Sequence, residues 1–224
     1  MLPRRATALA LLLFYTVGAR AEASLHLEDH TSPEVKAAIA AGKSTILIPI
    51  GGTEQNGEHI VLGKHNVRAR GLAADIAARL GDALVAPVVA YVPEGSIDPP
   101  TGHMRGAGTI SIPKDAFEKT LEGAARSLLH HGFRTVVLLG DHGGYQASLA
   151  RVAARVNGRA PKAVFVPREY YRELEHAGAE DAALSAAIDP KLVRQPQPTV
   201  GQGQRARKDI VAATAKAIQA FRSK

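Results

Sequence analysis

The stretch Ser44–His65, STILIPIGGTEQNGEHIVLGKH, decides how we read the fold of this chain. Its first part, Ser44–Ile50, is mostly apolar and rich in isoleucine, which predicts a buried strand. Two glycines follow and indicate that the strand ends in a turn. After them comes a dense set of polar side chains, namely Glu54, Gln55, Asn56, Glu58, His59 and His65. A loop that only connects two elements does not need so many ligand-type groups, so the end of this strand is a candidate functional site.

Apolar runs bounded by turn residues alternate with segments of helical period along the rest of the chain. This alternation predicts an α/β fold with a mostly parallel central sheet. The predicted strands are Ser44–Ile50, Ala83–Tyr91, Gly108–Ile112, Thr135–Leu139 and Ala163–Val166. The predicted helices are residues 65–80, residues 113–132, Gln146–Asn157, Ala179–Ile188 and Arg205–Phe221, with a loop over Gln195–Gln204.

Four loops of this arrangement carry a histidine or a carboxylate. One is the loop after Ser44–Ile50, and a second is GDHGGYQ, Gly140–Gln146, which follows another strand. The third and fourth are Glu175–Asp181 and the segment Ile97–Thr109. Because sites in open α/β sheets form beyond the carboxyl ends of the strands, we expect these loops to converge.

Histidine and carboxylate side chains that converge in this way suit a divalent metal ion. The 224 residues contain no cysteine, so any ion must be held by imidazole, carboxylate or amide groups. Such a ligand set favours zinc or manganese, with iron as a further candidate, and an open coordination position lets the ion acidify a bound water.

The N-terminal residues have the pattern of a targeting signal. Arg4 and Arg5 precede a short apolar run, and Ala19–Ala21 matches a cleavage site with small residues at both positions. We therefore predict a cleaved signal peptide over residues 1–21 and a single α/β domain over residues 22–224, exported to the periplasm or secreted. The apolar run is too short to span a bilayer, so we expect no stable membrane insertion after cleavage.

Charge and composition exclude some classes of partner. The net charge of +7 falls to +4 without the first 21 residues, because these contain three arginines and no acid. The remaining basic residues are scattered rather than gathered into a face or interleaved with aromatic platforms. A nucleic-acid-binding protein is not expected from this pattern, and we predict a small-molecule substrate instead.

Four motifs together resemble the creatininase (creatinine amidohydrolase) family. They read IPIGGTEQNGEH, GHMRGAGTISIP, HGFRTVVLLGDHGGYQ and HAGAEDAALSAAIDPKLVR. The similarity covers roughly Ser44–Arg194, which is most of the chain after the predicted signal peptide. The resemblance implies a three-layer α/β sandwich, commonly a homohexamer, with a two-metal centre that hydrolyses C–N bonds of amides. It places Glu54, His142 and Asp181 at metal-ligand positions and His176 at the position of the general acid and base.

Two positions depart from the family pattern. Asn56 stands where the family has a histidine ligand, and His65 stands where it has an aspartate that bridges two ions. A neutral imidazole offers one lone pair and cannot bridge as a carboxylate does. We therefore expect either one ion, held by Glu54, His65, His142 and Asp181, or a pair bridged by water alone, and we favour the single ion. Asp141 replaces a family glycine and is a candidate to restore the missing carboxylate.

Other side chains of these motifs have candidate roles around the ion. We expect Asn56, His59, His103 and Tyr145 to contact the substrate or to support the metal ligands. The leading hypothesis is an amidohydrolase that acts on a non-peptide C–N bond of a small molecule. Metal-bound hydroxide attacks the carbonyl of an amide, cyclic amide or formamide, and His176 transfers a proton. Creatinine is disfavoured, because the family's creatininases use tryptophans around the substrate and this chain has none. The alternative is a catalytically silent family member that binds a metal or small molecule in the periplasm.

Overall fold

The computed structural model describes residues 24–158, 162–194 and 200–223 of the chain. The predicted signal peptide, residues 1–21, lies outside these residues. At the centre is a four-stranded sheet in the order β2-β1-β3-β4, in which every neighbouring pair is parallel. The strands are Thr45–Ile50 (β1), Ala83–Val85 (β2), Thr135–Gly140 (β3) and Val164–Phe165 (β4). The predicted α/β fold with a parallel sheet is thereby confirmed.

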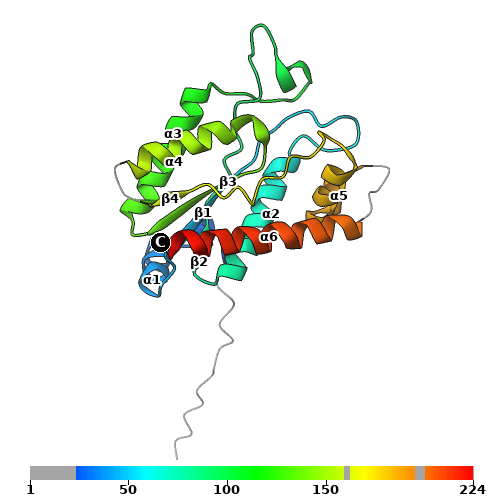
Figure 1. The fold of residues 1–224 in the computed structure, drawn as a ribbon. Coiled ribbons are helices and arrows are strands. Elements are labelled where there is room, and N and C mark those ends of the chain that lie inside the picture. Colours follow the sequence, from blue (N-terminus) through cyan, green and yellow to red (C-terminus); the bar gives the residue numbers. More distant parts are fainter. Residues whose placement is uncertain (1–23, 159–161, 195–199, 224) are drawn as a thin grey trace, which may run out of the picture.

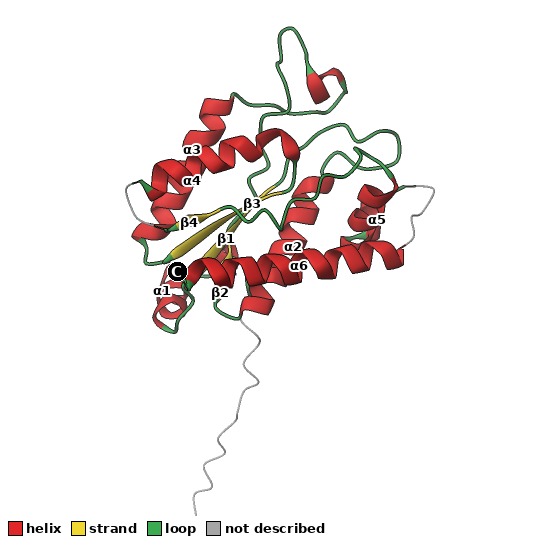
Figure 2. Ribbon diagram, in the orientation of Figure 1, coloured by secondary structure: helices red, strands yellow, loops and turns green. Residues whose placement is uncertain are grey.

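Helices cover both faces of the sheet, which gives three layers (Figure 1, Figure 2). They are Ser32–Ala40 (α1), Lys64–Leu80 (α2), Lys114–His130 (α3), Gln146–Asn157 (α4), Ala179–Ile188 (α5) and Val200–Arg222 (α6). Helices α3 and α4 pack together on one face, and α2, α5 and α6 pack on the other (Figure 1).

The two cores follow from the alternation of side chains along the strands. In β1, Ile46 and Ile48 join the core beneath α3 and α4, whereas Leu47 joins the core with α2 and α6. Strand β3 divides its valines and leucines between the two faces in the same way. Because both faces are covered, every residue of these two strands is buried, which explains their continuous apolar runs.

Two of the predicted strands differ in the structure. The strand predicted over Ala83–Tyr91 ends at Val85, and Val89 keeps only an isolated bridge to Ile50. Gly108–Ile112 forms no strand: the amides of Ile110 and Ile112 donate to the carbonyls of Thr53 and Val92, which lie in loops. Apolar alternation alone does not distinguish a strand from a loop that packs in extended form on its neighbours.

Two helices also differ from the prediction. Helix α1 was not expected from the sequence, although Pro33 and Glu34 are typical of a helix start, and the Glu34 carboxylate accepts the Thr31 amide at 2.7 Å. Helix α6 starts at Val200 rather than Arg205, and its glycines had been interpreted as loop residues. A Cβ on Gly203 would lie 1.8 Å from the Ala183 carbonyl oxygen, so this glycine permits close packing of α6 on α5.

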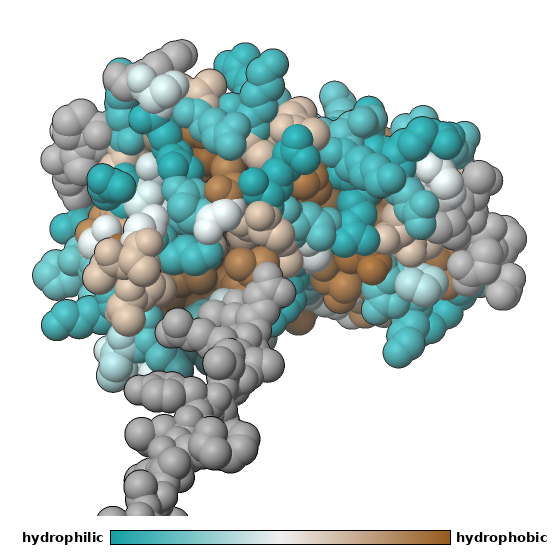
Figure 3. Space-filling view, turned by 90° about the horizontal axis from the view of Figure 1, so that it is seen from below, coloured by the Kyte–Doolittle hydropathy of each residue, from teal (hydrophilic) through white to brown (hydrophobic). Residues whose placement is uncertain are grey.

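Among the residues that the structure describes, no helix is both long enough and apolar enough to cross a membrane. Seen from below, hydrophilic residues cover much of the surface and hydrophobic residues are visible between them (Figure 3). Scattered apolar residues of this kind are usual on a folded protein.

Candidate metal centre

The loops that leave the carboxyl ends of β1 and β3 meet at one edge of the sheet. Glu54 follows β1 after two glycines, and His142 follows β3 by two residues. The long segment between β2 and α3 adds Glu94 and His103 to the same place. The expected convergence of distant loops beyond the strand ends is therefore what the structure shows.

Four side chains form what we call the open group: Glu54, Glu94, His103 and His142. Each offers one ligand atom, and these atoms all lie within 4.8 Å of one another. Glu54 Oε2 lies 3.3 Å from His103 Nε2 and 3.6 Å from His142 Nε2, and Glu94 Oε2 lies 3.7 Å from His142 Nδ1. These separations are what a single ion of zinc or manganese size between the groups would require.

The carboxylates of the open group are buried without hydrogen-bond partners. Glu54 is 0% exposed and Glu94 is 4% exposed. Glu54 Oε2 and both oxygens of Glu94 accept no hydrogen bond from any described residue. An unpartnered buried carboxylate is costly, so the arrangement fits a cation that would satisfy these oxygens.

The electrostatics of the open group favour the same interpretation. Burial, together with the nearby charge of Glu54, raises the pKa of Glu94 to about 9. Burial lowers the pKa of His142 to about 4, which keeps its ring neutral and able to act as a ligand. Burial also acts to raise the pKa of Glu54, but the hydrogen bond and charge of His65 outweigh it and lower the value to about 2.

A second group of buried side chains adjoins the open group, and we call it the ion-pair cluster. It consists of Lys64, His65, Arg68, Asp141 and Asp181. Lys64 and Arg68 each contact one oxygen of Asp181, and Arg68 Nε donates to Asp141 Oδ2 at 2.8 Å. The pKa of Asp181 is lowered to about 2, because the charges and hydrogen bonds of these two cations outweigh the effect of burial.

His65 connects the cluster to the open group. Its Nδ1 lies 2.6 Å from Asp141 Oδ2, and its Nε2 lies 2.8 Å from Glu54 Oε1. Carboxylates only accept hydrogen bonds, so both contacts are hydrogen bonds only when both ring nitrogens carry a hydrogen. In that state the ring has no lone pair to offer an ion.

Three of the residues predicted from the sequence as metal ligands thus have other partners. His65 contacts Asp141 and Glu54. Asp141 also accepts a hydrogen bond from Arg68, and Asp181 contacts both Lys64 and Arg68. Of the predicted ligands, Glu54 and His142 belong to the open group. His103, which we expected to support the ligands or contact the substrate, belongs to the open group as well.

Of the remaining predicted residues, His176 lies at the edge of the site and Asn56 hydrogen-bonds to backbone carbonyls. His176 Nε2 donates to the Gln55 carbonyl at 3.0 Å, and its Nδ1 lies 3.7 Å from Glu54 Oε1. Asn56 Nδ2 donates to the carbonyls of Glu54 and Val61 and so holds the loop in shape.

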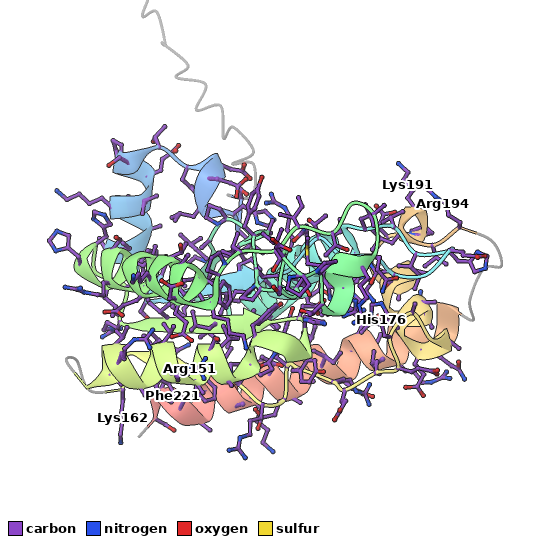
Figure 4. All side chains as sticks on the ribbon, turned by 90° about the horizontal axis from the view of Figure 1, so that it is seen from above. Arg151, Lys162, His176, Lys191, Arg194 and Phe221 are labelled. Atoms are coloured by element: carbon purple, nitrogen blue, oxygen red, sulfur yellow. The ribbon has the colours of Figure 1, made fainter. Side chains whose placement is uncertain are left out.

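Tyr145 is buried and contacts the backbone at the end of β1, whereas His59 is exposed. The buried Tyr145 hydroxyl lies 2.9 Å and 2.7 Å from the carbonyl oxygens of Ile50 and Gly51, so it supports the end of β1 rather than facing a ligand. His59 is exposed, and its carbonyl accepts the Arg194 amide. Figure 4 shows His176 toward the end of the molecule that carries Lys191 and Arg194, and away from the end with Arg151 and Lys162.

Sequence reasoning missed Glu94, Lys64 and Arg68. Glu94 lies in a Pro-Glu-Gly segment after an apolar run, the same pattern that had pointed to Glu54, but no family motif drew attention to it. Lys64 and Arg68 lie one turn apart at the start of a helix and read as ordinary surface cations. Their burial, at 1% and 4% exposed, is what reveals their role.

Two cavities open onto the site and share His103 and His142 as walls. The larger one, of about 510 Å³, is lined by Pro93–Ser96, Thr101, Ile112–Lys114 and Gly144 besides these two histidines. The other, of about 140 Å³, extends over the ion-pair cluster to Tyr171, Arg172 and His176. The larger volume is in the range of small-molecule sites.

A comparison with protein families identifies the chain. The family model for creatininase, described as creatinine amidohydrolase, matches residues 28–223. The chain belongs to the creatininase family. The resemblance predicted from the four sequence motifs is therefore confirmed, and the relatives with curated names are hydrolases.

Two relatives show how far this creatininase homologue is from characterised proteins. The mycofactocin precursor peptide peptidase of Mycolicibacterium smegmatis is 31% identical over 150 residues, covering 65% of this chain and 58% of that protein. The creatinine amidohydrolase of Pseudomonas putida is 29% identical over 119 residues, covering 53% of this chain and 45% of that protein. The aligned region thus spans about half the length of these relatives.

Solved creatininase structures share the fold. A crystal structure of creatinine amidohydrolase superimposes with a TM-score of 0.75 at 21% identity, covering 89% of this chain and 99% of that one. A structure named "Creatininase Mn" superimposes with a TM-score of 0.73 at 21% identity, covering 88% of this chain and 98% of that one. The predicted three-layer creatininase-like architecture is confirmed.

Proposed function

We propose that this creatininase family member is a metal-dependent hydrolase that cleaves a C–N bond of a small amide. The observation that carries the proposal is the open group, in which unpartnered buried oxygens of Glu54 and Glu94 face two histidines. The names of the relatives, a peptide peptidase and a creatinine amidohydrolase, support hydrolysis of a C–N bond. They also remove the reason to exclude peptide bonds, so the proposal includes short peptides.

The open group would hold one divalent ion through Glu54, Glu94, His103 and His142. Zinc and manganese suit this mixture of carboxylate and imidazole, and the relative named "Creatininase Mn" supports manganese as a choice. When bound, such an ion polarises a carbonyl oxygen and lowers the pKa of a water molecule. The larger cavity beside His103 and His142 would admit the substrate to this point.

His176 is the proposed carrier of the proton. Its Nε2 donates to the Gln55 carbonyl, so Nε2 carries the hydrogen and Nδ1 is left with a free lone pair. That lone pair lies 3.7 Å from Glu54 Oε1, at the border between the open group and the smaller cavity. His176 Nδ1 is thus placed to accept a proton from water and to return it to a leaving nitrogen.

The test of this proposal is to remove Glu94 and His142 from the open group. Glu94→Gln keeps the size of the side chain but lowers its strength as a ligand, and His142→Ala removes a ligand. We expect each variant to bind Mn²⁺ or Zn²⁺ at least ~100-fold more weakly, as measured by equilibrium dialysis and elemental analysis. Glu169→Gln, a change at an exposed glutamate, is the matched control. Unchanged metal content in both site variants would refute the proposed metal centre.

Activity is tested separately from metal binding. The Mn²⁺- or Zn²⁺-loaded protein is incubated with a panel of lactams, formamides, linear amides and dipeptides, with and without a chelator. We expect turnover that the chelator abolishes, and a His176→Ala variant that keeps its metal but loses most of its rate. A protein that binds metal and turns over no member of a broad panel would favour the silent binder over the enzyme.

We also propose that the protein acts outside the cytoplasm. The support is the signal-peptide pattern of residues 1–21. Mass spectrometry of the protein from its native host would then find a chain that begins at Glu22. A chain that retains residues 1–21 in the cytoplasmic fraction would contradict export without affecting the hydrolase proposal.

A further inference from the structure

The open group and the ion-pair cluster contain the same types of ligand but differ in their partners. Glu54 of the open group lies between them: its Oε2 faces the open group, while its Oε1 contacts His65 Nε2 of the cluster at 2.8 Å. On one side of this carboxylate, Glu54 Oε2 and both oxygens of Glu94 are buried and accept no hydrogen bond from the described part of the chain. On the other side, both oxygens of Asp181 already contact a cation.

The cations come from the start of helix α2. Lys64 and Arg68 lie one turn apart, so both side chains extend over the same face of the helix. Lys64 is 1% exposed, although lysine is among the residues most rarely buried. Arg68 bridges two elements, since it donates to Asp141 after β3 and to Asp181 on α5.

The charges of the cluster decide what else it can hold. Two aspartates face one ammonium and one guanidinium, so these four groups are already neutral together. A second divalent ion would add two positive charges beside these four balanced groups and would have to displace a cation from an aspartate. The open group offers the opposite situation, because no described residue donates a hydrogen bond to either oxygen of Glu94.

We infer that Lys64 and Arg68 are a built-in replacement for a second metal ion, so that each chain holds one divalent ion, in the open group. This inference rests on the proposed metal centre and adds to it the number of ions and the residues that set that number. The ammonium of Lys64 also borders the smaller cavity, together with His103 and His176. The Lys64 side chain therefore lies beside the space where the substrate would react.

The test counts ions in the full-length protein. Wild-type protein is dialysed to equilibrium against Mn²⁺ at micromolar free concentration, and manganese per chain is measured by elemental analysis. We expect one ion per chain. Two ions per chain would overturn this inference and leave the proposed function standing, whereas no bound ion would remove the proposed metal centre itself.

Two variants separate the possibilities further. Lys64→Met removes the ammonium at similar side-chain volume, and we expect it to take up a second ion as the Mn²⁺ concentration rises. Lys119→Met, at an exposed lysine, is the matched control and should still bind one. A Lys64→Met protein that binds one ion at every concentration would show that Lys64 does not exclude a second.

Glu94→Gln provides a second measurement of the number of bound ions, in a variant that keeps every residue of the ion-pair cluster. If the chain has one site, this variant should fall from one ion to none. A fall from two ions to one would reveal a second site and overturn the inference. This count does not depend on whether Lys64→Met folds.

Discussion

The open group and the ion-pair cluster lie side by side at the edge of the sheet, and both contain histidine and buried carboxylate groups. They differ because the start of helix α2 delivers Lys64 and Arg68 to one of them only. In the cluster, the aspartates are paired with these cations. In the open group, Glu94 accepts no hydrogen bond from any residue that the structure describes. The comparison teaches that the partners of a buried carboxylate, rather than its type or position, decide whether it is free to bind an ion.

The two regions also serve stability differently. The cluster joins α2, α5 and the loop after β3 through charges that satisfy one another. The open group adds an uncompensated carboxylate at the same depth, which costs free energy until an ion or a proton neutralises it. One region therefore holds the loops together, while the other keeps a site available at the expense of stability.

The largest expected effect is the loss of Arg68. Arg68→Met removes the guanidinium that contacts both Asp141 and Asp181, and it leaves buried carboxylates with fewer cations. We expect the free energy of unfolding, measured with urea, to fall by about 3–5 kcal/mol. Arg68→Lys keeps the positive charge but cannot contact both aspartates through separate nitrogens, so its free energy of unfolding should fall by less than that of Arg68→Met. A loss under about 1 kcal/mol for Arg68→Met would mean that the cluster does not stabilise the fold.

The open group predicts a change of the opposite sign. Burial raises the pKa of Glu94 to about 9 in the folded protein, above its ordinary value of 4.5. Its contribution to the stability of the ion-free protein is therefore full below about pH 4.5 and is lost as the pH rises toward 9. Glu94→Gln has no such loss, so at pH 8 we expect the ion-free variant to be more stable than wild type by roughly 2–4 kcal/mol.

Urea unfolding in the presence of a chelator, at pH 5 and at pH 8, measures this gain. Glu169→Gln is again the control. Equal stability of Glu94→Gln and wild type at both pH values would show that folding does not raise the pKa of Glu94. Together with the metal measurement, we expect Glu94→Gln to bind the ion more weakly and to be more stable than wild type in the absence of the ion.

The sequence predicted the four strands of the sheet, most of the helices and the meeting of the loops that form the candidate site, because these depend on apolar periodicity and on glycines at the strand ends. It could not divide the polar residues at that location into two groups. Asp181 matched a ligand position by order along the chain, but its partners Lys64 and Arg68 are defined only once α2 packs against α5. Glu94 was missed for the same reason, since its burial depends on a long loop that folds back over the site.

The dependence of the free energy of unfolding on pH below pH 5 tests the ion-pair cluster, with a smaller expected effect. The charges of Arg68 and Lys64 hold the pKa of Asp181 at about 2, below its ordinary value of 3.8. This stabilisation is present above about pH 3.8 and is lost as the pH falls through about 2, and it amounts to about 2 kcal/mol. Asp181→Asn should therefore lose less stability than wild type between pH 5 and pH 2, measured by urea unfolding. Asp209→Asn, on the exposed face of α6, should follow the wild-type curve, and identical slopes for all three proteins would contradict the ion pairing of Asp181.

The smallest expected effect comes from an ion pair of the same chemistry in water. Lys119 and Asp115 lie one turn apart on α3 at 3.4 Å, and their side chains are 80% and 71% exposed. We expect Lys119→Met to change the free energy of unfolding by no more than about 0.5 kcal/mol, because solvent screens the pair and holding two mobile side chains costs entropy. Lys64→Met removes the same ammonium from a site that is 1% exposed, so its loss should be several-fold larger. If the two lysine variants were equally stable, burial would not distinguish the ion pair of Lys64 from one at the surface. That result would contradict the inference that Lys64 replaces a second metal ion.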